Sequence, residues 1–199
     1  VLFRSTTFMS IGPAGEMKMY ASTVACTDRE QRPTRHAARG GSGAVMGSKG
    51  IKVIVFDDEG AKRLAPMDLD AFKAANKIFS EGLKKHAVTG EGLPAYGTNV
   101  LTNVINEAGG YPTRNFQKGR FEGASKISGE TIAEMEDARG GSSSHACHTG
   151  CIIKCSGIYH DADGKYLTKQ PEYETVWAHG GNCEIDDPDK IALMDRLDD

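Results

Sequence analysis

The sequence lacks a long hydrophobic segment, since no apolar run approaches the roughly 20 residues that a membrane-spanning helix needs. It also lacks an excess of positive charge: the formal net charge is −3, so no global basic field is present to hold nucleic acid. The first residues, Val-Leu-Phe-Arg-Ser-Thr-Thr, lack an initiator methionine and the charged-then-apolar layout of a signal peptide. These absences predict a piece of a larger cytoplasmic protein with neither a membrane span nor a nucleic-acid partner.

Cysteine is scarce and odd in number, with five residues in 199. Three of the five lie within nine residues, at Cys147, Cys151 and Cys155. This clustering does not suit an ordinary disulfide framework, and no signal sequence points to an oxidising compartment, so metal binding is the better interpretation. Glycine, by contrast, is abundant at 24 residues, and the content of hydrophobic (39%) and charged (26%) residues is typical of a folded globular protein.

Hydrophobic periodicity divides the chain into a β-rich beginning and a helical remainder, with a boundary near residues 57–66. Residues 5–11 and the β-branched run 51–56 predict strands, the second of them buried. Apolar residues near a 3.6-residue period predict helices over 66–83, 99–107 and 128–137, and a fourth from Pro188 to the end of the chain. Residues 157–167 predict a hairpin around Asp161–Gly164. We therefore expect an α+β protein divided at residues 1–62 and 63–199.

The cysteine run could hold either of two metal centres. Three thiols at steps of four, in a segment that contains glycine, can converge on an iron–sulfur cluster, because thiolates are the usual ligands of such clusters. A structural zinc site completed by His145 or His148 is the competing possibility. A cubane cluster needs a fourth ligand, and Cys183 is the one cysteine that follows the run.

A second candidate site is the Gly-rich stretch Arg39–Lys49, which we interpret as an anion-binding loop. Its glycines let the backbone approach a ligand closely, and nearby arginines can fork onto phosphate. It differs from a nucleotide-binding P-loop, because Gly47 is followed by Ser48 before Lys49 and because the clear strand follows the loop instead of preceding it.

A third candidate is the pair of carboxylates Glu172 and Glu174, 17 and 19 residues after Cys155. In a strand, two residues two apart point the same way, whereas in a turn they diverge. The spacing alone leaves both geometries open.

Taken together, five segments in order resemble the aldehyde ferredoxin oxidoreductase family of tungsten- or molybdenum-pterin enzymes. The most specific of them is RHAARGGSGAVMGSK. The segments are Ile11–Glu16 (IGPAGE), Arg35–Lys49, Pro112–Phe116, Ile127–Glu130 with the cysteine run, and Glu172–Thr175.

The resemblance implies a site residue by residue. Two pyranopterins would hold one tungsten (or molybdenum), with their phosphates bridged by Mg²⁺ and a 4Fe–4S cluster beside them. The cluster ligands would be Cys147, Cys151 and Cys155, and the working carboxylate would be Glu174 rather than Glu172. The residues against the pterin phosphate and magnesium would be Arg39, Gly40, Gly41, Gly43 and Ala44.

The family also implies a domain arrangement and a reaction. Residues 1–62 would be the end of an α+β pterin-binding domain, and residues 63–199 the beginning of a mostly helical iron–sulfur domain. The complete enzyme, an anaerobic oxidoreductase, would oxidise an aldehyde to a carboxylate and pass electrons to ferredoxin, and a homo-oligomer is compatible with this.

Two departures from the family pattern and two alternatives stand beside this expectation. The cysteine spacing is C-x3-C-x3-C where the family has C-x2-C-x3-C, so we expect the extra residue to bulge, and Gly50 stands where asparagine is common. We expect Cys183 to be a packed thiol, not a ligand. The alternatives are a carboxylic-acid or aromatic thioester reductase of the same family, and a non-catalytic iron–sulfur or zinc-binding module.

Overall fold

The computed structural model describes residues 6–62 and 64–198, which fall into two compact units. The first unit extends to Met67, and the second comprises Asp68–Asp198. Both units combine helices with antiparallel strands, so the α+β class is confirmed. None of the described helices is long and apolar enough to cross a membrane.

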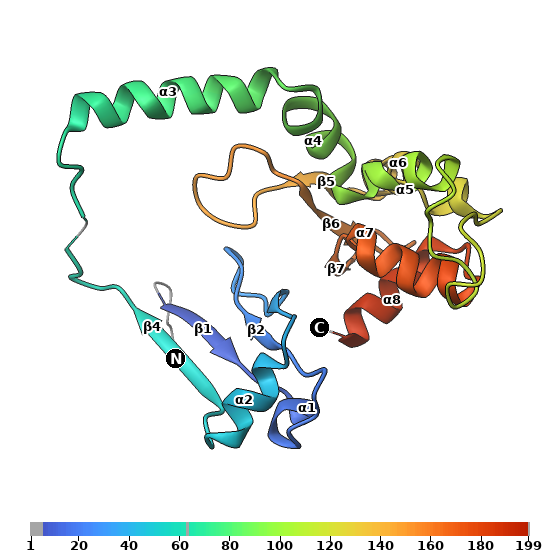
Figure 1. The fold of residues 1–199 in the computed structure, drawn as a ribbon, viewed down its shortest axis with the longest axis horizontal. Coiled ribbons are helices and arrows are strands. Elements are labelled where there is room, and N and C mark those ends of the chain that lie inside the picture. Colours follow the sequence, from blue (N-terminus) through green and yellow to red (C-terminus); the bar gives the residue numbers. More distant parts are fainter. Residues whose placement is uncertain (1–5, 63, 199) are drawn as a thin grey trace. The chain divides into compact units, whose positions relative to one another are not determined.

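The first unit is a four-stranded antiparallel sheet with two short helices. The sheet order is β3-β2-β1-β4, from β1 (Thr6–Ser10), β2 (Val24–Cys26), β3 (Arg35–Ala37) and β4 (Val53–Asp57). The helices are α1 (Pro13–Glu16) and α2 (Ser42–Ser48), and Figure 1 shows them next to each other. A small core of Ile11, Val24 and Met46, with Met9 packed against it, joins the sheet to the helices.

The expected strand over residues 51–56 is confirmed as β4, but the prediction that it is buried is wrong. All five of its residues are exposed. β4 lies at the edge of the sheet and pairs with β1 from Thr6↔Asp57 to Ser10↔Val53. The β-branched residues therefore predict correctly that this segment is a strand. They do not predict its burial, which depends on what packs against the faces of the strand.

The reading of residues 39–49 as a loop is wrong for Ser42–Ser48, which form helix α2. The helix contains Gly43 and Gly47, which lower its intrinsic propensity. Both are required by packing, because a Cβ at Gly43 would lie 2.4 Å from the Thr23 carbonyl oxygen and one at Gly47 would lie 2.0 Å from the Gly15 carbonyl oxygen. Close packing on α1 and its following loop thus overrides helix propensity here.

The second unit begins with a long helix and continues with short helical segments. α3 (Leu69–Lys85) starts at Asp68, whose side chain accepts a hydrogen bond from the Ala71 backbone N–H at 2.9 Å. After it come a π-helical turn η1 (Ala87–Gly92), α4 (Leu93–Tyr96), η2 (Gly97–Val100), α5 (Leu101–Glu107), η3 (Ala124–Ile127) and α6 (Gly129–Arg139). The expected helices over 66–83, 99–107 and 128–137 correspond to α3, η2 with α5, and α6.

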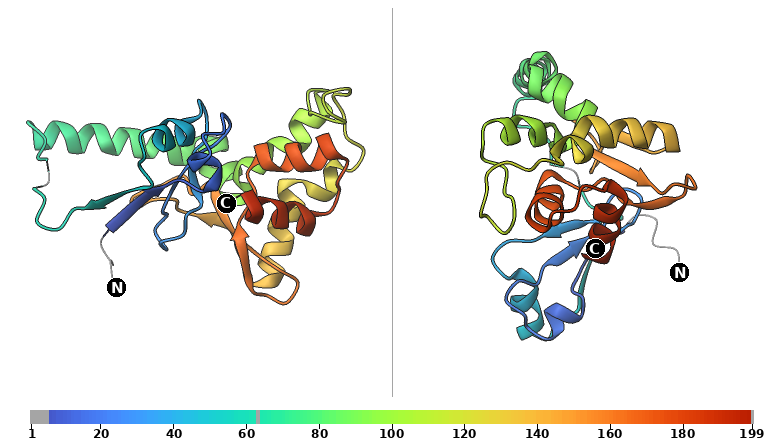
Figure 2. Two further views of the ribbon diagram at one scale, coloured as in Figure 1. Left: turned by 90° about the horizontal axis from the view of Figure 1, so that it is seen from below. Right: turned by 90° about the vertical axis from the view of Figure 1, so that its right-hand side faces the viewer.

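A three-stranded antiparallel sheet of order β5-β6-β7 follows in the second unit, formed by β5 (Ser142–His145), β6 (Ser156–His160) and β7 (Tyr166–Lys169). The expected hairpin is confirmed as β6–β7, and Figure 2 shows its strands in orange meeting at a turn. The chain then forms α7 (Tyr173–Thr175), η4 (Val176–Gly180), η5 (Gly181–Cys183) and α8 (Pro188–Asp198).

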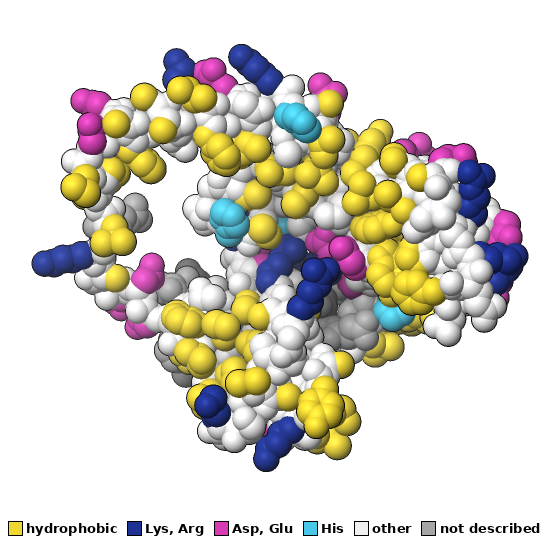
Figure 3. Space-filling model, viewed as in Figure 1, with side chains coloured by type: hydrophobic (Ala, Val, Ile, Leu, Met, Phe, Trp, Pro, Cys, Tyr) yellow, Lys and Arg dark blue, Asp and Glu magenta, His cyan; other side chains and the backbone are white. Residues whose placement is uncertain are grey.

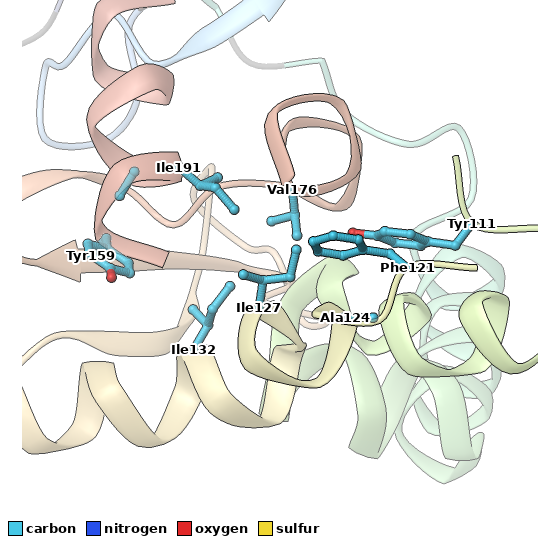
Figure 4. Close-up of a cluster of buried hydrophobic side chains, with 9 residues drawn as sticks. Tyr111, Phe121, Ala124, Ile127, Ile132, Tyr159, Val176 and Ile191 are labelled. Atoms are coloured by element: carbon cyan, nitrogen blue, oxygen red, sulfur yellow. The ribbon is translucent and has the colours of Figure 1, made fainter. Parts of the chain in front are cut away.

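The core of the second unit lies between α6, η3, the β6 strand and the C-terminal helices (Figure 4). Its buried side chains are Tyr111, Phe121, Ala124, Ile127, Ile132, Tyr159, Val176, Ile191 and Ala192. At its border the Arg139 guanidinium forms a two-pronged ion pair with Asp189, at 2.5 and 3.1 Å, and the Tyr159 hydroxyl donates to Asp189 at 2.8 Å. This contact fixes α8 against α6 and β6.

Candidate metal centre and anion-binding loop

The cysteine run occupies the connection between β5 and β6. The antiparallel pair His145↔Ser156 closes this connection at its base, so residues 146–155 form a loop that returns to the sheet. Cys147, Cys151 and Cys155 are all free thiols and all half-buried. The sheet therefore brings the three expected ligands into one loop, anchored at both ends.

Two of the three cysteines already meet in a geometry suited to a metal. The Sγ atoms of Cys147 and Cys151 and a ring nitrogen of His148 lie within 4.8 Å of one another. The Lys154 backbone N–H donates to the Cys151 sulfur at 3.4 Å. Gly150, with φ of +87°, lies in the stretch that has one residue more than the family pattern, and its left-handed backbone accommodates the turn.

Cys155 lies immediately before β6, outside this group of three. Burial raises the pKa of its thiol, and the nearby Glu172 carboxylate and the Cys147 and Cys151 thiols raise it further. A thiol whose ionisation is opposed by burial and by neighbouring negative charge fits a site that binds a cationic centre, because a metal offsets this repulsion and deprotonates its thiol ligands. The donor set of soft sulfurs thus fits an iron–sulfur cluster, while His148 keeps the zinc alternative chemically open.

The two candidate carboxylates diverge, because their segment is the beginning of a helix and not a strand. Glu172 is the N-cap residue of α7 and is half-buried, and its Oε2 atom accepts a hydrogen bond from the Thr98 hydroxyl at 2.7 Å. Glu174 lies in the first turn and is exposed. The structure thus places Glu172 beside the cysteine loop and leaves Glu174 accessible.

Helix α7 is held in place by contacts on several sides. The Tyr173 N–H donates to the Thr98 hydroxyl at 2.9 Å, and the Tyr173 ring packs edge-on against the buried Tyr111, with centroids 6.1 Å apart. The Thr175 hydroxyl donates to the buried Asp195 of α8 at 3.1 Å. Glu174 therefore projects from a rigid element, which is what a working carboxylate requires.

In the first unit, the candidate anion-binding residues separate into two groups. Gly41 and Gly43 serve packing, since a Cβ at Gly41 would lie 2.7 Å from the Tyr20 carbonyl oxygen. Gly40 has φ of +86° and open space around the position of a Cβ, and the neighbouring Arg39 is exposed. Ala44 is half-buried within α2. Arg39 and Gly40 are therefore the members of the set that a bound anion could reach directly.

One residue of the site was not predicted from the sequence. Thr98 makes two contacts with the Glu172–Tyr173 segment although 74 residues separate it from Glu172. Nothing in the local sequence marks this threonine, because its role depends on a long-range contact.

Comparison with known proteins gives one consistent result. Residues 73–199 match the family described as aldehyde ferredoxin oxidoreductase, domains 2 and 3, and residues 2–58 match the N-terminal domain of the same enzymes. The chain is 45% identical to a tungsten-containing aldehyde ferredoxin oxidoreductase of Pyrococcus abyssi and 44% identical to one of Pyrococcus horikoshii, in each case over 96% of this chain and 29% of the relative. An aliphatic sulfonate oxidoreductase, WOR-like subunit, of Pyrococcus furiosus is 27% identical over 95% of this chain and 28% of its own length.

Proposed function

Because the chain belongs to the aldehyde ferredoxin oxidoreductase family, we propose that it works as part of a tungsten-containing enzyme that oxidises an aldehyde to a carboxylic acid. The chain spans about 29% of the length of the Pyrococcus relatives, so the reaction requires a longer polypeptide than the residues described here. In this proposal the electrons leave the site through a 4Fe–4S cluster and pass to ferredoxin, which the names of the relatives include for those proteins.

The observation that carries this proposal is the cysteine loop within a chain that matches the family along nearly its whole length. Cys147, Cys151 and Cys155 would hold the cluster, and half-burial would keep most water away from it. Arg39 and Gly40 would contact the pterin phosphate and its Mg²⁺, with Gly41, Gly43 and Ala44 shaping that turn. The tungstopterin supplies the two-electron redox chemistry when bound.

Glu174 is the residue that moves a proton in this proposal. Oxidation of an aldehyde to the acid adds one oxygen from water and releases two electrons and two protons, so a base must take up a proton as water reacts. An accessible carboxylate on the firmly held α7 suits that role, and general-base help is worth roughly 10²–10⁴ in rate.

Metal analysis of the complete gene product tests the proposal. We expect tungsten or molybdenum together with roughly four irons per polypeptide, as a 4Fe–4S cluster requires. Zinc alone would instead assign Cys147, His148 and Cys151 to a structural site and end the oxidoreductase proposal.

A further inference from the structure

The β6–β7 hairpin brings the end of the cysteine loop near the segment that leads to Glu172. Its pairs Tyr159↔Thr168 and Ile158↔Lys169 run toward the base of the hairpin, where the Gln170 N–H donates to the Gly157 carbonyl at 2.9 Å. The cysteine loop ends at Cys155, two residues before Gly157, and Glu172 follows Gln170 by two residues. Cys155 and Glu172 therefore belong to two segments that the base of this hairpin holds together.

The Glu172 carboxylate is fixed, not mobile. The Thr98 hydroxyl donates to it at 2.7 Å and accepts from the Tyr173 N–H at 2.9 Å, so one hydroxyl ties the side chain to the backbone that follows it. The next residue, Asn99, is 1% exposed and donates to the Pro171 carbonyl at 2.6 Å. The backbone on both sides of Glu172 is thus attached to η2.

The η2 segment also contacts the cysteine loop directly. A Cβ at Gly97 would lie 3.1 Å from the Cys155 carbonyl oxygen and 3.1 Å from the Gln170 side-chain oxygen. Gly97 has φ of +61°, and the residue that follows it is Thr98. Cys155, the turn at Gly97 and the Glu172 segment therefore pack as one body, which keeps the carboxylate at a constant distance from the expected cluster ligand.

We propose that Glu172, held by Thr98, is an electrostatic tuning residue that lowers the reduction potential of the iron–sulfur cluster bound through Cys155. The inference rests on the proposed function, and it gives the two carboxylates of one short motif different roles. Glu174 acts as the base that takes up a proton, while Glu172 influences the reduction potential of the cluster. A fixed negative charge near the cluster disfavours the reduced state, which carries one more electron. The electron therefore leaves the cluster more readily for an acceptor such as ferredoxin.

The main test is Glu172→Gln in the complete holoenzyme, with the midpoint potential of the cluster measured by redox titration followed by EPR. Glutamine can still accept from Thr98 but carries no charge. At the wild-type midpoint potential we expect the ratio of reduced to oxidised cluster to rise by about tenfold, which equals about 59 mV for a one-electron couple. The matched control is Glu134→Gln on the exposed face of α6, and it should leave the potential unchanged.

Substitutions of Thr98 test the positioning part of the proposal. Thr98→Val keeps the shape and removes the hydroxyl, so it should raise the potential in the same direction by a smaller factor. Thr98→Ser keeps the hydroxyl and should restore the wild-type value, which a purely structural role for the side chain would not require.

Each other outcome counts against the inference in a distinguishable way. An unchanged potential with full iron content in Glu172→Gln overturns the tuning role and leaves the proposed function intact. Loss of iron in that variant makes Glu172 a support for cluster binding, which also overturns tuning. A wild-type enzyme without iron refutes the proposed function itself and the inference with it.

Discussion

At the scale of single residues, neighbours in sequence occupy very different environments. Glu172 and Glu174 are two positions apart, yet one is bound by Thr98 and the other is exposed. Glu136 is more extreme, since it is fully buried in α6 and neither carboxyl oxygen has a hydrogen-bond partner among the described residues. These environments, more than residue type, decide what each carboxylate does.

Replacing Glu174 tests its proposed role as a base. Glu174→Gln in the complete enzyme should leave the tungsten, pterin and iron contents near those of the wild type while kcat falls by roughly 10²–10⁴. Glu172→Gln should lower turnover less. Full turnover in Glu174→Gln would make this residue dispensable and move the base elsewhere in the protein.

Two cysteine substitutions distinguish an expected cluster ligand from a cysteine that does not bind the cluster. Cys151→Ala should lower the iron content and stop electron delivery to ferredoxin, because Cys151 lies in the cluster of donor atoms with Cys147. Cys183→Ala should do neither. The expectation that Cys183 is a packed thiol is wrong, because its side chain is exposed, and its sulfur donates to the Ala178 carbonyl. Iron per polypeptide and the visible absorbance of the cluster are the measurements. The reverse pattern would show that the ligand assignment is wrong.

The buried Glu136 predicts a dependence of stability on pH. Burial, with a smaller contribution from the neighbouring Asp137, raises the pKa of Glu136 from 4.5 to about 9. The folded state therefore keeps a proton that the unfolded state loses, so the stability contributed by this group is complete below pH 4.5 and is lost as the pH rises to about 9. The loss by pH 7 is roughly 3 kcal/mol at most.

Glu136→Gln removes this titration without changing the shape of the side chain. The free energy of unfolding of the variant minus that of the wild type should increase with pH between 4.5 and about 9, whatever its absolute value. Denaturant unfolding of the complete protein at several pH values measures the difference. A difference that is constant across this range would show that Glu136 is hydrated in solution.

At the scale of elements, helix ends and turns follow local rules, and these were predictable. Asp68 caps α3, and the Asp187 side chain accepts from the Asp189 and Lys190 N–H groups at the beginning of α8. The turn at Asp161–Gly164 is likewise predictable from local sequence, because its aspartates and glycine are typical turn residues. In contrast, β2 and β3 are only three residues long, and the sequence of β5 is Ser-Ser-Ser-His. No hydrophobic alternation therefore predicts these three strands.

For the candidate site, too, local patterns can be predicted from the sequence and long-range contacts cannot. The cysteine run is local in sequence, so its spacing alone predicts a metal centre, and this assignment stays a prediction. The Thr98–Glu172 contact and the burial of Gly43 against Thr23 depend on long-range packing, which no local pattern encodes. Helix α2 was missed for that reason, because its glycines suggest a loop until the neighbouring segment is known.

The packing of α1 on α2 gives a prediction at this scale. Gly47→Ala would put a methyl group 2.0 Å from the Gly15 carbonyl oxygen, so the helices must separate, at a cost of about 1–3 kcal/mol in the free energy of unfolding. The control is Gly12→Ala, where φ is −84° and the position of a Cβ has open space. Chemical denaturation of both variants measures the effect. Equal stability of the two would show that α1 moves aside without cost.

At the scale of the whole molecule, large apolar side chains remain uncovered in both units. In the first unit every residue of β4 is exposed, with Phe56 at 50%. In the second unit no residue of α3 is buried, and Phe79 is 64% exposed; Figure 3 shows hydrophobic side chains along this helix. Exposed faces of this kind mark surfaces that other protein segments cover.

We therefore expect the 199-residue chain, expressed alone, to be unstable and inactive. It should bind a hydrophobic dye and unfold over a broad range of temperature, because the faces of β4 and α3 would lie open to water. Calorimetry and metal analysis of the isolated chain provide the test. One cooperative unfolding transition together with bound tungstopterin would contradict the prediction.

The turn of the β6–β7 hairpin is a suitable place for a spectroscopic label. The Asp161 carboxylate accepts from the Asp163 and Lys165 N–H groups at 3.0 and 2.9 Å, so the turn is stabilised by its own residues. A register irregularity at Tyr159/His160 separates this turn from the regular pairs that lead to Cys155. A nitroxide spin label at the exposed Asp163 would therefore leave the cysteine end undisturbed. Its dipolar coupling to a paramagnetic iron centre would measure their separation in solution.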